Sequence, residues 1–199
     1  MIISNDKVIL RDFIESDIEK RIHWEINENE WQQWDAPWEY HGLTSEEKLR
    51  DLEIYVEKMK GWPAFFESME KDKKRTTFQI VVNDGSDEYI GWCNSYLLDD
   101  NYEFSTKGYK RAVGIDIPDM NARGKGLGYS TLQLFISYLM SQGEQDIYTQ
   151  TWSGNIKMIK LAEKLGFEEC KRKKDIRKVR GEEYDGLTFR LNMEKFKSL

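Results

Sequence analysis

The feature that most constrains the fold is a glycine-rich turn between an apolar strand and a long helix. The segment Gly114–Tyr129 reads GIDIPDMNARGKGLGY. Gly124, Gly126 and Gly128 lack a Cβ atom, so the main chain there can turn tightly and approach a ligand closely. The N–H groups of the first helical turn have no partner within the helix and lie at the positive end of its dipole. The segment therefore predicts a binding site for a phosphate or pyrophosphate.

Two common nucleotide-binding patterns do not fit this turn. A P-loop requires Lys followed by Ser or Thr, whereas Lys125 is followed by Gly126. The dinucleotide fingerprint requires three glycines spaced as G-x-G-x-x-G. Counted from Gly124, the third position is Tyr129, and counted from Gly126 it is Thr131. The spacing therefore excludes both classes of nucleotide-binding protein.

A second motif lies downstream of the turn. Arg123, Gly126 and Gly128 fill the pattern R-x-x-G-x-G, and the segment 155–167 reads NIKMIKLAEKLGF. Together these segments resemble the acetyl-CoA pyrophosphate loop and the N-x(10)-G-F helix of the GNAT superfamily of N-acetyltransferases. The pattern is most similar to the branch of ribosomal-protein-alanine and aminoglycoside 6′-N-acetyltransferases. The resemblance implies an acyltransferase that uses acetyl-CoA as its co-substrate.

The expected order of elements, β-α-α-β-β-β-α-β-α-β-β, agrees with a GNAT layout. We expect an α/β (α+β) fold in which about four helices flank a mixed, mostly antiparallel sheet of about seven strands. A single domain should cover residues 1–199.

Periodicity and turn residues place strands at 8–11, 77–82, 89–98, 111–117, 146–152, 167–179 and 184–193. Helices are expected at about 15–30, 44–60 and 155–165 and after the glycine turn. Thr44 and Glu47 predict a capping box for the second of these helices, which Gly61 and Pro63 should stop. The helix after the glycine turn should pack on the sheet through an apolar stripe: Leu132, Phe135, Ile136, Leu139 and Met140.

The resemblance also assigns cofactor contacts. In the superfamily the strand before the turn runs beside the pantetheine arm, which gives this role to the main chain of Ile115 and Ile117. The amides that would hold the pyrophosphate belong to Gly124, Lys125, Gly126, Leu127, Gly128 and Tyr129. Arg123 and Lys125 would add positive charge. Asn155 matches a helix-starting Asn that contacts the arm, and a plain N-cap role is equally open.

The chain departs from its family at the proton donor. Many members carry Tyr where this chain has Ala162, and the Ser of the ribosomal-protein branch is replaced by Met158. A thiol of pKa about 8.5 leaves near neutrality with little help, so the loss need not abolish turnover. The spacer from Pro118 to Arg123 is also longer than usual, which leaves the lip of the loop undefined.

A general base matters more than an acid, because an alkyl amine is protonated at neutral pH. Asp116 is the candidate, since it lies in an otherwise apolar strand beside the proposed pantetheine contacts. The run Gly114-Ile115-Asp116 resembles the strand of aminoglycoside 6′-N-acetyltransferases in which an Asp serves the acceptor amine. The alternative is a structural Asp116 that caps the adjacent turn.

Five of the seven tryptophans lie in the N-terminal third, interleaved with acidic residues. In GNAT proteins this region walls the acceptor cleft, and aromatic faces with carboxylates suit a cationic amine. Trp31, Trp34 and Asp116 are the predicted acceptor contacts. The alternative is that the tryptophans pack in the core while the acids face water.

Three functions remain open from the sequence. The first is an N-acetyltransferase that acts on a primary amine of a small cationic acceptor, such as an aminoglycoside or a polyamine. The second is a protein N-terminal acetyltransferase of the ribosomal-protein type. The third is a catalytically inert CoA-binding sensor, suggested by Ala162 and Met158.

Composition narrows the partners. The formal charge of −6 argues against nucleic acid, although the run 171–180 holds seven Lys or Arg and could meet RNA, the CoA 3′-phosphate or solvent alone. Two cysteines without a C-x-x-C pattern, and only His23 and His41, argue against a metal site. No signal-like segment opens the chain, and the uncharged segment 126–143 is too polar to cross a membrane. We expect a cytoplasmic enzyme without a metal or membrane partner, with homodimer formation left open.

Overall fold

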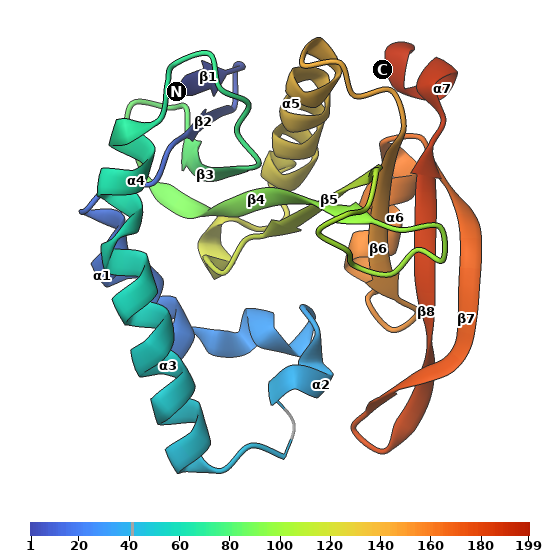
Figure 1. Ribbon diagram of the computed structural model, residues 1–199, viewed down its shortest axis with the longest axis horizontal. Helices are drawn as coiled ribbons and strands as arrows, with labels where there is room; N and C mark the ends of the chain where they lie inside the picture. Colours follow the sequence, from blue (N-terminus) through green and yellow to red (C-terminus); the bar gives the residue numbers. More distant parts are fainter. Residues whose placement is uncertain (41) are drawn as a thin grey trace. The chain divides into compact units, whose positions relative to one another are not determined.

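The protein has a mixed α/β fold whose strands form a mostly antiparallel sheet, as expected (Figure 1). The computed structural model describes residues 1–40 and 42–199, so His41, weighed above as a metal ligand, lies outside the described residues. In the described part the strand order is β1-β2-β3-β4-β5-β6-β8-β7. The strands are β1 Ile2–Ser4, β2 Val8–Arg11, β3 Thr77–Val82, β4 Tyr89–Leu98, β5 Lys110–Asp116, β6 Ile147–Trp152, β7 Phe167–Val179 and β8 Glu182–Leu191. All seven expected strands are confirmed, and β1 is additional.

The helices are more numerous than the sequence indicated. They are α1 Asp17–Ile26, α2 Pro37–Tyr40, α3 Ser45–Lys60, α4 Trp62–Ser68, α5 Leu127–Ser141, α6 Ile156–Lys164 and α7 Met193–Lys197, with 3₁₀ turns η1 Asn29–Gln33 and η2 Met120–Ala122. Gly61 ends α3 as predicted, but Pro63 does not continue the break. It lies in the first turn of α4, where a missing N–H costs nothing.

The contacts within the chain define two compact units. Unit 1 comprises Met1–Trp92 with Asp116–Lys125, and unit 2 comprises Cys93–Ile115 with Gly126–Leu199. The boundaries fall inside β4 and at the end of β5. The single domain expected over the whole chain therefore remains a prediction, and each unit is described on its own.

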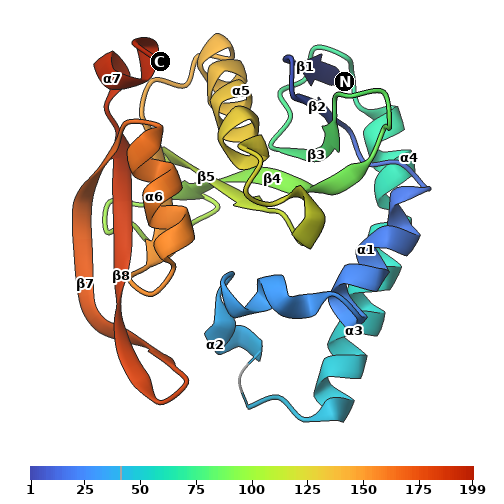
Figure 2. The same ribbon diagram turned by 180° about the vertical axis from the view of Figure 1, so that it is seen from behind.

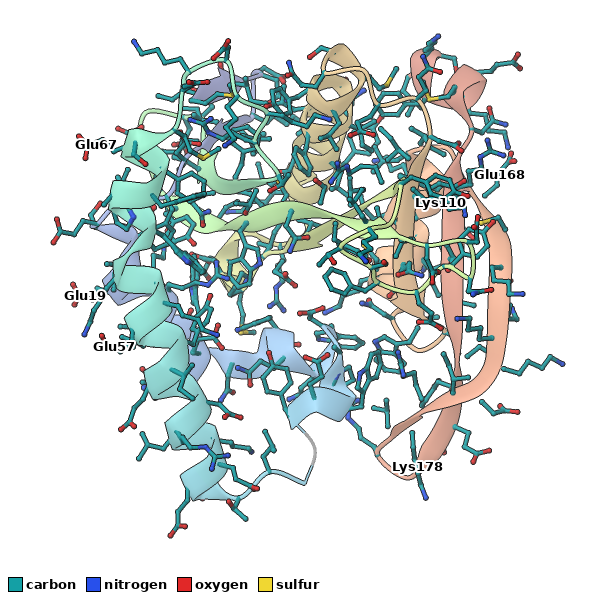
Figure 3. All side chains as sticks on the ribbon, viewed as in Figure 1. Glu19, Glu57, Glu67, Lys110, Glu168 and Lys178 are labelled. Atoms are coloured by element: carbon teal, nitrogen blue, oxygen red, sulfur yellow. The ribbon has the colours of Figure 1, made fainter. Side chains whose placement is uncertain are left out.

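Unit 1 combines an antiparallel β1-β2-β3 ladder with the helices of the N-terminal half. α1 and α3 lie side by side in both ribbon views (Figures 1 and 2). Thr44 and Glu47 form the predicted capping box at the start of α3. Acids on the outer sides of these helices, including Glu19, Glu57 and Glu67, point to solvent (Figure 3). These three acids therefore face water and not the interior of unit 1.

Unit 2 is built on α5, whose apolar stripe is buried as predicted. Leu132, Phe135, Ile136 and Leu139 have no exposed surface. β5 and β6 are parallel, β6 pairs antiparallel with β8, and β8 pairs with β7 in a long hairpin. No helix in the described residues is long and apolar enough to cross a membrane.

Two members of the basic run of β7 have acids of the same hairpin beside them. Lys178 is opposite Glu183 in the hairpin, near its turn (Figure 3). Arg172 forms ion pairs with both Glu169 and Asp185. This pairing favours the reading of a solvated hairpin strand over a nucleic-acid surface.

Candidate functional site

The glycine turn has the backbone geometry that an anion site needs. Gly124 and Gly126 have φ angles of 76° and 80°, the left-handed region that glycine adopts without strain. Gly126 is the N-cap of α5 and supplies no side-chain cap. The first hydrogen bond of the helix runs from Ser130 N to Gly126 O at 3.1 Å, so the preceding N–H groups lie outside the helical ladder. The residues at the turn thus fit a pyrophosphate.

The parallel pairing of β5 with β6 stops before either strand ends. Its last pair is Val113 with Thr149, where Thr149 Oγ1 also donates to Val113 O at 2.8 Å. β5 continues to Asp116, while β6 stays paired with β8 as far as Trp152. The edge of Gly114 and Ile115 that would face β6 is therefore not used by β6. An extended amide-bearing chain such as pantetheine could hydrogen-bond there.

The long spacer before the glycine turn is ordered by its own contacts. Asp119 caps η2, accepting hydrogen bonds from Asn121 N at 2.9 Å and Ala122 N at 3.3 Å. The Arg123 guanidinium donates to Ile117 O at 2.8 Å and Pro118 O at 3.2 Å. The carbonyl of Ile117 thus already has a partner, and the predicted role of Ile117 toward pantetheine is left to its N–H.

Asn155 serves as the N-cap of α6. Its side chain accepts a hydrogen bond from Met158 N at 3.1 Å, so the capping role is confirmed, and a contact with the pantetheine arm remains a prediction. Ala162 is completely buried in α6. The position of the family's Tyr therefore offers a small apolar side chain and no proton donor.

Asp116 lies at the end of β5 and is half-buried. Burial raises the pKa of this carboxyl well above its usual range, and the negative charge of Asp35 raises it further. Arg21 and a hydrogen bond from Trp92 oppose the rise. Gly91 permits this placement, because a Cβ there would lie 2.1 Å from Asp116 O. An elevated pKa is typical of a carboxyl that works as a general base near neutrality.

Glu25, Asp35 and Asp116 form what we call the carboxyl cluster. Burial raises the pKa of Glu25. The negative charge of Asp35 adds to this rise, and the positive charge of Arg21 opposes it. The pKa of Asp35 is raised by loss of water around its carboxyl and by Glu39, although the residue keeps an exposed side. Like charge from Asp35 thus acts on Glu25 and Asp116, an arrangement that a bound cation would relieve.

Arg21 is the cation that faces this cluster, and aromatic rings hold it. Its guanidinium lies 2.9 Å from the centre of the Trp92 ring and donates to Tyr89 Oη at 3.3 Å. Its Nε is 4.0 Å from Glu25 Oε1, too far for a hydrogen bond. One guanidinium therefore acts on two carboxyl groups, those of Glu25 and Asp116, and the pKa of each stays raised.

Two buried polar atoms beside the cluster lack a hydrogen bond. Arg21 Nε and Tyr55 Oη make no hydrogen bond of standard geometry within the described residues, although Nε is ion-paired with Glu25 and the Arg21 side chain lies beside the Tyr55 ring. Burial raises the pKa of the Tyr55 hydroxyl. The negative charges of Glu25 and Asp116 add to this rise, and Arg21 opposes it. Since buried polar groups are almost always satisfied in native proteins, the two atoms suit hydrogen bonds to water or to a polar ligand.

The two predicted acceptor tryptophans differ in their surroundings. Trp31 is 6% exposed and belongs to a core cluster with Trp24, Tyr89 and Trp92, and its Nε1 donates to Trp24 O at 3.1 Å. The core-packing alternative thus describes Trp31 well. Trp34 is only half-buried, and its Nε1 donates to Glu30 Oε1 at 2.6 Å.

Sequence reasoning missed Glu25, Arg21 and Tyr55 as members of the site. Glu25 stood among the acids near the tryptophans, but nothing in the sequence distinguished it from the exposed Glu28. Helical spacing offered one signal, because Arg21 and Glu25 are separated by one turn of α1. Among the described residues no group of His, Cys, Asp and Glu could hold a metal ion.

The raised pKa of Asp116 gives a prediction about stability. A carboxyl whose pKa is higher in the folded state destabilises the protein once the pH exceeds its unfolded value of about 3.9. Asp116→Asn should therefore raise Tm at neutral pH, by about 2–4 °C per kcal/mol for a chain of this size. The gain should vanish near pH 4, where both side chains are neutral. Thermal unfolding from pH 4 to 8 measures it, and a Tm loss at every pH would indicate a structural cap instead.

The chain is similar to known proteins both in a family model and in solved structures. The family model described as acetyltransferase (GNAT) domain matches residues 7–168. No match was found among curated proteins. Among solved structures, a GNAT-family acetyltransferase from Bacillus anthracis aligns with a TM-score of 0.67 at 15% identity, covering 98% of this chain and 99% of its own.

Two other similar structures carry more specific names. Spermidine N-acetyltransferase from Vibrio cholerae, in complex with CoA and spermine, aligns with a TM-score of 0.63 at 18% identity, covering 97% of this chain and 99% of its own. Ribosomal-protein-alanine N-acetyltransferase from Brucella melitensis aligns with a TM-score of 0.58 at 17% identity, covering 91% and 97%. At these identities the likeness concerns the fold. Since the family match spans most of the sequence, the chain belongs to the acetyltransferase (GNAT) domain family.

Proposed function

We propose that the protein transfers an acetyl group from acetyl-CoA to a primary amine of a small cationic acceptor, of the aminoglycoside or polyamine kind. The observation that carries the acceptor class is the carboxyl cluster. The negative charge of Asp35 raises the pKa of both Glu25 and Asp116, and the guanidinium of Arg21 opposes both shifts without removing them. An ammonium group bound there would supply the missing positive charge.

The cofactor part of the proposal rests on backbone geometry. The N–H groups from Gly124 to Tyr129, aided by the charge of Lys125, would hold the pyrophosphate at the start of α5. The open edge of Gly114 and Ile115, and Asn155, would hold the pantetheine arm. When bound, acetyl-CoA supplies an activated acetyl thioester.

Asp116 has two tasks in this proposal. As a carboxylate it binds the acceptor ammonium, and it then takes one proton from that ammonium, directly or through water, to free the lone pair. Its raised pKa makes it a stronger base than an ordinary Asp. Asp116 directly follows Ile115, so the chain itself keeps the base next to the proposed pantetheine contact.

The relatives support the chemistry in general terms but do not select the acceptor. The Vibrio cholerae enzyme is named for spermidine and the Brucella melitensis enzyme for a ribosomal-protein alanine. The carboxyl cluster favours the small cation. A protein N-terminus would be the alternative acceptor, and an inert CoA-binding sensor the alternative to catalysis.

An acceptor panel tests the proposal. Free-thiol release from acetyl-CoA should be fast with polyamines and aminoglycosides, slower with monoamines, and slowest with peptides that begin with Ala or Ser. Preference for the peptides would favour the ribosomal-protein type. Absence of release with every amine, while acetyl-CoA still raises Tm, would favour the sensor.

Asp35→Asn gives a sharper test of the acceptor class. Removing one charge from the carboxyl cluster should raise KM for a diamine about tenfold or more, the usual loss for a charge-assisted hydrogen bond. KM for acetyl-CoA should not change. Glu28→Gln makes the same charge change at an exposed position and is the matched control. An equal rise in KM for both variants would show that only general charge matters.

A further inference from the structure

The guanidinium of Arg123 is held entirely by groups of unit 1. Its Nε donates to Ile117 O at 2.8 Å, and one terminal nitrogen donates to Pro118 O at 3.2 Å. The other terminal nitrogen forms an ion pair with the carboxylate of Glu30. A planar fork with three acceptors in different directions fixes the orientation of the side chain.

Glu30 joins this fork to the tryptophan-rich segment. One carboxylate oxygen accepts from Arg123, and the other accepts from Trp34 Nε1 at 2.6 Å. Glu30 lies in η1, directly before the buried Trp31 and one helical turn before the half-buried Trp34. The side chains of Glu30 and Arg123 are 33% and 23% exposed, so the pair is partly shielded from water.

The position of Arg123 in the chain gives this contact its importance. It ends η2 and directly precedes Gly124, the first residue of the glycine turn. The spacer from Pro118 to Arg123 is longer than the family pattern. Its extra residues need contacts of their own if the glycine turn is to keep one conformation. Asp119 fixes the beginning of the spacer and the Arg123 fork fixes its end.

We propose that Glu30 and Arg123 are positioning residues that join the glycine turn to the acceptor-side segment 29–34, and that Arg123 acts through this link and not on the pyrophosphate. The charge of Arg123 is already offset by Glu30, so the pyrophosphate is left to the loop amides and Lys125. The link makes the placement of Trp34 depend on the turn. Its effect on the acceptor rests on the proposed function, whereas the link itself does not.

Acetyl-CoA affinity separates the two possible roles of Arg123. If Arg123 is a positioning residue, Glu30→Gln and Arg123→Gln should change the affinity alike, and the double variant should be no weaker than either single variant. If Arg123 binds the pyrophosphate, Arg123→Gln should weaken acetyl-CoA binding about tenfold or more. Glu30→Gln would then leave the affinity unchanged or increase it, because it frees the guanidinium. That result would overturn the proposal.

Two readouts do not depend on turnover. In thermal unfolding, the Tm losses of Glu30→Gln and Arg123→Gln should be non-additive, whereas Glu28→Gln with Arg123→Gln should be additive. Glu30→Gln should also shift tryptophan emission, and the shift should disappear in a Trp34→Phe background. Additive losses, or a shift that persists without Trp34, would refute the link.

Kinetics then connects the link to the acceptor. With a polyamine, both single variants should raise KM for the amine more than KM for acetyl-CoA. If the unfolding and fluorescence results hold but no amine is acetylated, the proposed function fails and the link stands. If amines are acetylated but the Tm losses of Glu30→Gln and Arg123→Gln are additive, the proposed function stands and the link fails.

Discussion

Gly126→Asp should abolish the stabilisation that acetyl-CoA gives to the folded protein. A ligand that binds only the native state raises Tm, because it adds about 2.7 kcal/mol to the free energy of unfolding when its concentration is one hundred times Kd. Gly126 caps α5 at φ 80° in an exposed turn. A carboxylate there would place a negative charge where the pyrophosphate is expected and would compete for the same N–H groups.

Gly143→Asp is the matched control for this experiment. Gly143 follows the other end of α5, has a φ of 90°, and has open space around its missing Cβ. The two variants therefore share the strain of a left-handed Asp, but only Gly126→Asp touches the proposed site. Thermal shift with acetyl-CoA should be lost in the first and kept in the second. A folded Gly126→Asp protein that binds acetyl-CoA as tightly as the parent would refute the loop assignment.

The parts of the fold that sequence predicted well are those with local causes. The capping pair Thr44 and Glu47, the glycine at 166 after α6, and the apolar stripe of α5 each act within a few residues. The added elements have weaker local signals. Pro63 was interpreted as a helix stop because proline breaks helices from inside, whereas at the first turn it starts one.

The acceptor side shows why a site is harder to predict than a fold. Glu25 and Asp116 are 91 positions apart in sequence, and only the fold lets Glu25 raise the pKa of Asp116. Gly91 shows the same limit, because no local pattern indicates that its missing Cβ admits the carbonyl of Asp116. The prediction for Asp116 had a local basis, because a charged residue in an apolar strand must be paired or functional, and its role as a base stays a prediction.

The kinetic effect of Asp116→Asn should be the largest produced by any neutral substitution in the site. An alkyl ammonium of pKa about 10.4 must lose a proton before it attacks, which costs about 4.6 kcal/mol at pH 7. Asn can keep the shape of the side chain and accept the hydrogen bond from Trp92, but it cannot take the proton. We expect kcat/KM for a polyamine to fall about 100-fold or more, within the range of general bases, while acetyl-CoA affinity is unchanged.

The pH dependence of this loss distinguishes a base from a structural residue. Because the pKa of Asp116 is raised, the parent should lose activity with falling pH sooner than an ordinary Asp would allow, and Asp116→Asn should lack this acid limb. Toward about pH 10 the solution supplies free amine, so the deficit of the variant should shrink as the acceptor approaches its own pKa. Profiles of kcat/KM from pH 5 to 10 for both proteins provide the measurement. A kcat/KM deficit that stays constant across the range would assign Asp116 to binding or structure. The loss caused by removing a general base shrinks once the amine is already deprotonated, whereas the loss of a binding or structural residue does not.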